Sequence, residues 1–260
     1  MSRLRKKFIL KLIFRCLVLV FGIVLLIGKY TFLPEGSFLA NSFNILDGYK
    51  FFTEFSVFHI IWVLWVIGMI QQIFPIKTKL PLGSTKRSIF RFKGPQGEVD
   101  YPGMREYIKT VTKKAYIRVF LVWAIATAII GVLYYWGPLD NAWIMVISLF
   151  FYVCDLICVV IWCPFRLLLG NRCCTTCRIF NWDHLMMFSP MIFVGGFFGT
   201  SLFILAVAAF MVWEVSIMIF PERFWMQSNV SLKCVNCTDK LCTQYCGKKK
   251  KAKKNTDTKA

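Results

Sequence analysis

Residues 116–162 read YIRVFLVWAIATAIIGVLYYWGPLDNAWIMVISLFFYVCDLICVVIW, two apolar runs separated by Gly137 and Pro138. Each run has the roughly 20 residues that an α-helix needs to cross a hydrocarbon core of ~30 Å. Tryptophan and tyrosine stand at the ends of the runs, as they do at the interfaces of membrane spans. This stretch therefore predicts a hairpin of two membrane-spanning helices, over about 116–136 and 142–163.

Further apolar runs continue this pattern on both sides of the hairpin, and they predict spans at about 8–28, 55–75, 183–198 and 200–221. Lys11 and Arg15 interrupt the first run and no small-x-small motif follows it, which favours an uncleaved helix over a signal peptide. Hydrophobic residues make up 57% of the chain, against roughly 45 to 50% in soluble domains. The predicted fold class is all-α, a polytopic membrane helix bundle over residues 1–222.

Positive charge predicts the orientation of this bundle. Lys and Arg outnumber Asp and Glu by six to none over 1–15, and by ten to three over both the basic loop 76–115 and residues 221–260. Cytoplasmic loops of membrane proteins carry such an excess of Lys and Arg. We therefore expect a multi-pass protein of the cell membrane with the N-terminus and the C-terminus in the cytoplasm.

The number of spans depends on the apolar run of 36 residues from Leu185 to Phe220. A cytoplasmic C-terminus requires this run to cross twice, and Gly195, Gly196 and Gly199 provide a turn within it. Six spans are therefore predicted. The alternative has five spans, with 183–198 re-entrant or in the interface and the C-terminal tail outside.

The chain has eleven cysteines, of which Cys16, Cys154 and Cys158 fall inside predicted helices, where a small thiol packs well. The other eight follow the fourth and sixth spans: Cys163, Cys173, Cys174, Cys177, Cys234, Cys237, Cys242 and Cys246. On the six-span topology all eight face the cytoplasm, a reducing compartment in which clustered thiols are typical of metal sites rather than disulfides. These eight are the predicted metal ligands.

The tail cysteines follow the spacing C-x2-C-x4-C-x3-C within the cysteine-rich segment 223–247. Four thiolates complete a tetrahedral zinc site or hold an iron–sulfur cluster. The spacing resembles a zinc knuckle with Cys in place of His and one residue missing. The alternatives for the tail are free or palmitoylated thiols, or two disulfides if the tail lies outside.

The group after the fourth span reads C-x9-C-C-x2-C from Cys163 to Cys177. It supplies a second tetrad, shares one site with the tail, or packs as a simple cysteine-rich loop. His184 is a further candidate, since it completes a Cys3His set with Cys173, Cys174 and Cys177.

The sequence Trp162-Cys163-Pro164-Phe165 at a helix end, followed by cysteines, resembles the Cys-Pro elements of polytopic membrane ferredoxin-like proteins of the periplasmic nitrate reductase and nitrous oxide regulator type. This resemblance implies iron–sulfur electron transfer, although the chain lacks the full ferredoxin runs of those families. Residues 171–183 together with 231–237 also resemble an uncharacterised family of bacterial polytopic membrane proteins, a resemblance that implies no activity.

Three ionisable side chains fall at predicted membrane depth: His59, Asp155 and Glu214. A charged group there costs ~2.5 to 3.5 kcal/mol on insertion scales and usually faces the bundle interior. Asp155 and Glu214 form either a carboxylate pair that shares a proton or a cation, or separate packing contacts with Ser, Thr or Trp. His59 is interpreted as an interfacial histidine. Haem is not expected, because its only histidine partner, His184, lies toward the opposite face.

The basic disordered tail 248–260 is predicted to bind anionic lipid head groups through Lys248, Lys249, Lys250, Lys251, Lys253 and Lys254. No stacking platform or groove-reading motif accompanies these lysines, so nucleic acid is not an expected partner. The chain also lacks a Walker loop, a dinucleotide fingerprint and the other motifs of soluble enzymes, and no catalytic residue is predicted.

The leading hypothesis from sequence is therefore a membrane protein with a cytoplasmic cysteine-ligated metal centre, either structural zinc or an iron–sulfur cluster for electron transfer. One alternative is a small transporter or channel that uses Asp155 and Glu214. Another is a membrane anchor or assembly factor whose protein partner is unknown.

Overall fold

The computed structural model describes residues 3–31, 39–74, 92–94, 98–165, 182–225 and 227–232, and these ranges contain helices, turns and loops but no strand. The predicted all-α class is confirmed for this part of the chain. The basic tail 248–260 and most of the cysteine-rich segment 223–247 lie outside the described residues.

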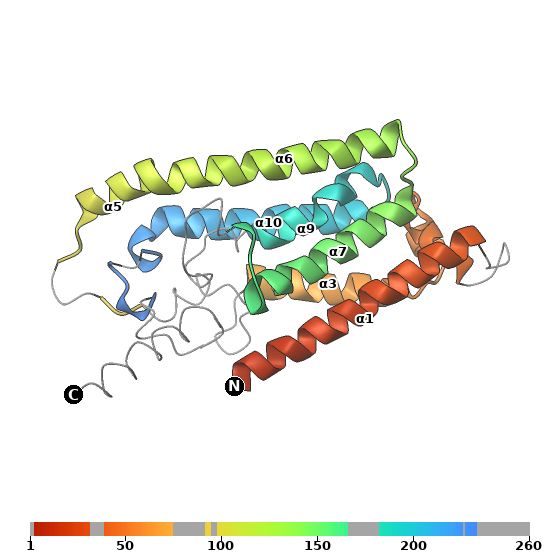
Figure 1. Ribbon diagram of the computed structural model, residues 1–260, viewed down its shortest axis with the longest axis horizontal. Coiled ribbons are helices and arrows are strands. Elements are labelled where there is room, and N and C mark those ends of the chain that lie inside the picture. Colours follow the sequence, from red (N-terminus) through yellow and green to blue (C-terminus); the bar gives the residue numbers. More distant parts are fainter. Residues whose placement is uncertain are drawn as a thin grey trace, which may run out of the picture.

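Five long helices build the bundle shown in Figure 1: α1 (Arg3–Thr31), α3 (Phe58–Ile73), α6 (Lys113–Tyr135), α7 (Asn141–Val160) and α10 (Phe197–Ile219). Four of them contain segments long and apolar enough to cross a membrane, namely Arg5–Thr31, Tyr116–Tyr135, Asn141–Val160 and Phe197–Ile219. α3 is also apolar but has only 16 residues. These helices fit a multi-pass membrane protein in a lipid bilayer.

Short elements join the long helices: η1 (Ala40–Leu46), α2 (Lys50–Thr53), α5 (Tyr101–Tyr107), the π-helical η2 (Ile108–Thr112), α9 (Asp183–Phe188), the 3-10 helix η5 (Ser189–Phe193), η6 (Pro221–Arg223) and η7 (Val230–Leu232). The predicted span 183–198 is not one regular helix, because α9 ends at Phe188 and the chain continues as η5. Pro190 explains the change, since proline lacks the N–H and clashes with the carbonyl that would continue an α-helix.

α5, η2 and α6 follow one another without a break and form one long helix along the outer side of the bundle in Figure 1. This helix begins at Tyr101, inside the segment 76–115 that was predicted to be a loop. Asp100 caps it by accepting a hydrogen bond of 2.9 Å from the Gly103 N–H. Pro102 lies in its first turn, where proline is well tolerated.

α1 and α7 run antiparallel and are tied by ion pairs at two levels. Arg15 Nη1 lies 2.8 Å from Asp155 Oδ2, and Lys29 Nζ lies 2.8 Å from Asp140 Oδ2. Between these pairs the Leu149 side chain packs directly on Gly22, because a Cβ on Gly22 would lie 2.6 Å from Leu149 Cδ1. Glycine at this crossing therefore permits the close packing of the two helices.

α3 and α10 run parallel, with a tryptophan hydrogen bond near each end of the pair. Trp62 Nε1 donates to Ser201 Oγ at 2.9 Å, and Trp213 Nε1 donates to the Gln72 carbonyl at 3.1 Å. The core lies between these helices, α7 and α9, where the buried Trp65 ring meets Phe188 edge-on at 5.0 Å between centroids.

α6 is the least buried of the long helices, and its apolar segment is only 11% buried within the chain. Its inner side meets η5, where Trp123 Nε1 donates to Ser189 Oγ at 3.1 Å and the Phe193 ring packs on Gly131. Most of the α6 surface is thus available to lipid.

Candidate functional site

Of the eight cysteines predicted as metal ligands, only Cys163 belongs to the described residues. Its side chain is 4% exposed and lies three residues beyond the end of α7. The other seven lie outside the described part of the chain: Cys173, Cys174, Cys177, Cys234, Cys237, Cys242 and Cys246.

Cys163 lines a cavity of about 260 Å³ between α6, α7 and α9, and Cys154 and Cys158 of α7 line the same cavity. The i, i+4 spacing of the two α7 cysteines places them on one face of the helix. Two carboxylate residues, Asp155 and Asp183, also belong to the lining. The remaining lining residues are apolar: Val122, Trp123, Ala126, Phe150, Phe151, Pro164, Phe165, Met186 and Met187.

Thiol groups line this cavity, and thiolates are the ligands that zinc, copper(I) and iron–sulfur clusters prefer. The rest of the wall is mostly apolar. Within the described ranges, however, no group of three or more His, Cys, Asp or Glu side chains is arranged to hold a metal ion. The described thiols would therefore need ligands from residues 166–181 or 233–260 to complete a metal site.

Asp155 is held by Arg15 rather than by a second carboxylate. The Arg15 guanidinium donates to Asp155 Oδ2 at 2.8 Å and to the Tyr152 carbonyl at 2.6 Å, and it stacks on the Tyr152 ring at 3.7 Å. The side chains of Arg15 and Asp155 are 15% and 17% exposed. The buried acid is thus paired and hydrogen-bonded, as a charge at this depth requires.

Glu214 has a different donor, because its Oε1 accepts a hydrogen bond of 3.2 Å from Trp182 Nε1. Trp182 in turn packs against Phe210 and against Tyr116 of α6, both at 5.9 Å between ring centroids. The structure does not bring Asp155 and Glu214 together as a carboxylate pair. The contact of Glu214 with a tryptophan is of the kind that the sequence analysis gave as its alternative, whereas the pairing of Asp155 with Arg15 was not predicted.

Both ring nitrogens of His59 are bonded to the backbone. Nδ1 accepts from the Ser56 N–H at 3.1 Å, and Nε2 donates to the Phe51 carbonyl at 2.9 Å. The ring also stacks on Phe55, with an interplanar angle of 4°. His59 thus connects α2 to the start of α3 through hydrogen bonds, and both of its ring nitrogens are already engaged rather than available to a haem iron.

His184 belongs to a polar cluster where α3 ends and α9 begins. Gln72 Nε2 lies 2.7 Å from His184 Nδ1 and 3.5 Å from Asp183 Oδ2. Asp183 Oδ1 also lies 2.9 Å from His184 Nδ1. Gln72 is only 2% exposed, and its backbone carbonyl is the acceptor for Trp213. This cluster fixes the entry into α9 beside the cavity.

Near the other end of α1 and α7, Asp140 caps α7 through the Trp143 N–H and accepts hydrogen bonds from Lys29 and Tyr30. Burial raises the pKa of Asp140, but these hydrogen bonds and the Lys29 charge outweigh burial and leave the pKa below its usual value. Asp140 therefore stays ionised and holds the two helices together.

The sequence analysis assigned Cys154 and Cys158 to helix packing and did not connect them with Cys163. The spacing of Cys154 and Cys158 places them on one helical face, whereas Cys163 joins the cavity lining only because the chain leaves the helix after Val160. The sequence analysis treated Arg15 only as an interruption of the first span. The opposite charges of Arg15 and Asp155 were the signal in the sequence that could have predicted their pairing.

In comparisons with known proteins, no family model, no curated protein and no solved structure matches the chain. The resemblances noted in the sequence therefore stay predictions, and the function is argued from the residues themselves.

Proposed function

We propose that this is a six-span protein of the cell membrane that carries a cysteine-ligated metal centre on its cytoplasmic side, beside the end of α7. The observation that carries the proposal is the cavity that Cys154, Cys158 and Cys163 all line. The chain continues from this cavity toward Cys173, Cys174 and Cys177, so the thiols of the bundle and of the following segment are close in sequence. The centre serves either as structural zinc or as an iron–sulfur site for electron transfer.

The contacts at the two ends of the α9–η5 segment support the six-span topology. At its start, His184 contacts Gln72 at the end of α3, and after its end the Phe197 N–H donates to the Gly48 carbonyl at 3.2 Å. Gly48 belongs to the connection between α1 and α3, which the charge pattern predicts to be external. The segment thus reaches from the cytoplasmic end of α3 to the external connection.

The length of the segment makes this a short crossing. Six α-helical and five 3-10 residues span about 19 Å at rises of about 1.5 and 2.0 Å per residue, against a hydrocarbon core of ~30 Å. Irregular backbone is tolerated at membrane depth where protein surrounds it. Phe188, Met191 and Val194 are at most 1% exposed, which supports that environment.

The transport alternative has weaker support. A carboxylate that binds a passing cation needs an open position, whereas Asp155 is already paired with Arg15 and Glu214 accepts a hydrogen bond from Trp182. The anchor or assembly-factor alternative has no partner surface that the described residues define.

Metal analysis of the full-length protein tests the proposal. The protein is purified without oxygen in mild detergent, and bound zinc and iron are measured together with the visible spectrum. We expect at least one metal ion per chain, and we expect Cys163→Ser to lower this content strongly. Cys16→Ser is the matched control, because Cys16 lies on α1 and does not line the cavity.

Protein that contains no zinc or iron, or a Cys163→Ser variant with full metal content, would contradict the assignment of Cys163. The topology has its own test in C-terminal fusions to green fluorescent protein and to alkaline phosphatase. Six spans predict a fluorescent first fusion and an inactive second one, and five spans predict the reverse.

A further inference from the structure

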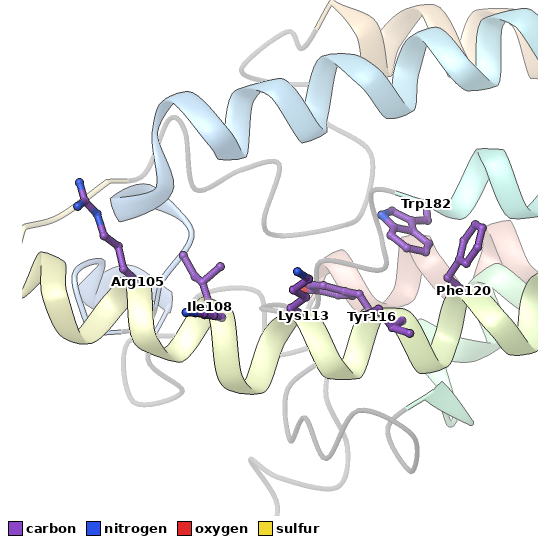
Figure 2. Close-up of a pocket in the computed structure, with 8 residues that line it drawn as sticks. Arg105, Ile108, Lys113, Tyr116, Phe120 and Trp182 are labelled. Carbon is purple, nitrogen blue, oxygen red and sulfur yellow. The ribbon is translucent and has the colours of Figure 1, made fainter.

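A second cavity, of about 570 Å³, lies on the long helix α5–η2–α6, and none of the described cysteines lines it. Figure 2 shows its lining side chains along this helix, with Trp182 on the opposite wall. Three of the lining residues are cations, Arg105, Lys109 and Lys113, and none is acidic. The volume lies within the range of about 300–1,000 Å³ that is typical of small-molecule sites.

The three cations are spaced four residues apart, so that they follow one side of the helix. All three residues are exposed, and none makes an ion pair with a carboxylate of the described residues. Their charges are therefore available to an anionic ligand.

The same side of the helix becomes apolar and aromatic at Tyr116, Ile117 and Phe120, which also line the cavity. Trp182 faces this part, with ring centroids 5.9 Å from Tyr116 and 6.4 Å from Phe120. The cavity thus has a cationic end and an aromatic end, arranged along the helix axis.

The membrane position of the helix matches this division. The apolar segment of α6 begins at Tyr116, and Lys113 stands three residues before it, which is about 5 Å along the axis. The head-group region extends about 5 to 8 Å beyond the hydrocarbon core. With the hydrocarbon core beginning at Tyr116, as the apolar segment suggests, Lys113 falls at head-group depth, Lys109 and Arg105 fall farther out, and the aromatic end falls at acyl-chain depth.

We propose that this cavity binds one anionic phospholipid of the cytoplasmic leaflet. The phosphate lies among Lys113, Lys109 and Arg105, and an acyl chain lies along Tyr116 and Phe120 against Trp182. Basic pockets between membrane helices on the cytoplasmic side bind such head groups. The lipid fills the space between α6 and Trp182.

Lipid titration of the full-length protein in mild detergent tests this proposal. The probes are phosphatidylglycerol, phosphatidylcholine with the same chains, and inorganic phosphate, and binding is followed by native mass spectrometry. The double variant Lys109→Gln/Lys113→Gln should bind phosphatidylglycerol about 30-fold more weakly, from the contribution of each surface lysine to anionic-lipid binding. The control Lys6→Gln/Lys7→Gln removes two exposed charges from α1 and should change the affinity less than about twofold.

Phosphatidylcholine and inorganic phosphate are expected to bind much more weakly than phosphatidylglycerol. Equal binding of the two lipids, competition by phosphate at equal concentration, or the same loss in both double variants would overturn the site. Thermal unfolding without added lipid should be unchanged in all variants, because the substituted lysines are exposed.

A second measurement locates the acyl chain. Phosphatidylglycerol brominated on its chains should quench tryptophan fluorescence, and Trp182→Phe should remove part of this quenching at equal lipid occupancy. Quenching that is unchanged in Trp182→Phe would contradict the predicted position of the chain.

Discussion

Arg15 of α1 and Asp155 of α7 form a largely buried ion pair, with 2.8 Å between Nη1 and Oδ2, inside two helices that are apolar enough to cross a membrane. The same arginine stacks on the Tyr152 ring and donates to the Tyr152 carbonyl. The pair therefore fixes the positively charged Arg15 of the first span beside the thiol-lined cavity, which Asp155 helps to line.

Removing one partner of this pair should destabilise the bundle. Asp155→Ala leaves the Arg15 charge buried without its carboxylate, and we expect a loss of about 3–5 kcal/mol in the free energy of unfolding. The measurement is denaturant unfolding in detergent micelles. Arg15→Met/Asp155→Leu should recover most of the loss, because neither charge remains.

The Lys29–Asp140 pair joins the same two helices and is the matched control, because it is less buried, with side chains 31% and 41% exposed. Lys29→Met should cost at most about 1 kcal/mol, as is typical of exposed ion pairs. Equal losses for Asp155→Ala and Lys29→Met would contradict the special importance of the buried pair.

Gly196 should not tolerate a side chain, whereas its neighbour Gly195 should. A Cβ on Gly196 would collide with the Leu46 carbonyl oxygen, and nothing lies within 4 Å of the corresponding position on Gly195. Gly196→Ala is expected to lower stability by about 1–3 kcal/mol, the usual cost of overpacking. Gly195→Ala should leave the thermal midpoint nearly unchanged, and a similar shift in both variants would argue against this close contact.

Gln72→Leu should destabilise the entry into α9. The substitution removes the amide that contacts Asp183 and His184, and a buried polar group that loses a partner costs about 1–3 kcal/mol. Gln71→Leu is the control, because Gln71 is less buried than Gln72. Comparable unfolding curves for the two variants would be evidence against the polar cluster.

Asp140 should make stability depend on acid pH. The pKa of Asp140 in the folded protein lies below the usual pKa of an aspartate, so its contribution to stability is complete above the usual pKa and is lost as the pH falls through the folded pKa. Thermal midpoints measured between pH 6 and 3 should fall less steeply for Asp140→Asn than for the natural chain. Asparagine is a suitable comparison because it caps a helix about as well as aspartate.

The long apolar runs were sufficient to predict the helices at 8–28, 55–75, 116–136, 142–163 and 200–221, since length and hydropathy alone identify such segments. Apolar length did not predict the structure of 183–198. Pro190 interrupts the α-helix there, so that the segment forms two short helices among the surrounding helices rather than one. The apolar runs also missed the start of the long helix at Tyr101, because Pro102 and Gly103 are typical of loops unless a cap such as Asp100 is recognised.

The candidate site was predictable only in part for a related reason. Clustering along the chain singled out Cys163 as a candidate. That Cys163 lines one cavity with Cys154 and Cys158 depends on how α6 and α9 pack around α7. In the same way, the partner of Asp155 lies 140 residues away in the chain, and only the antiparallel packing of α1 on α7 brings it into contact.

On the proposed six-span topology, the short α9–η5 segment also has a consequence for biogenesis. Lipid alone cannot satisfy the irregular backbone between Phe188 and Gly196, and a span of this length is a poor substrate for independent insertion. The segment can take its place only when α10 is already available to pack beside it. When the ribosome has synthesised the chain only through residue 196, α10 does not yet exist. The α9–η5 segment and α10 must therefore enter the bilayer together as one hairpin.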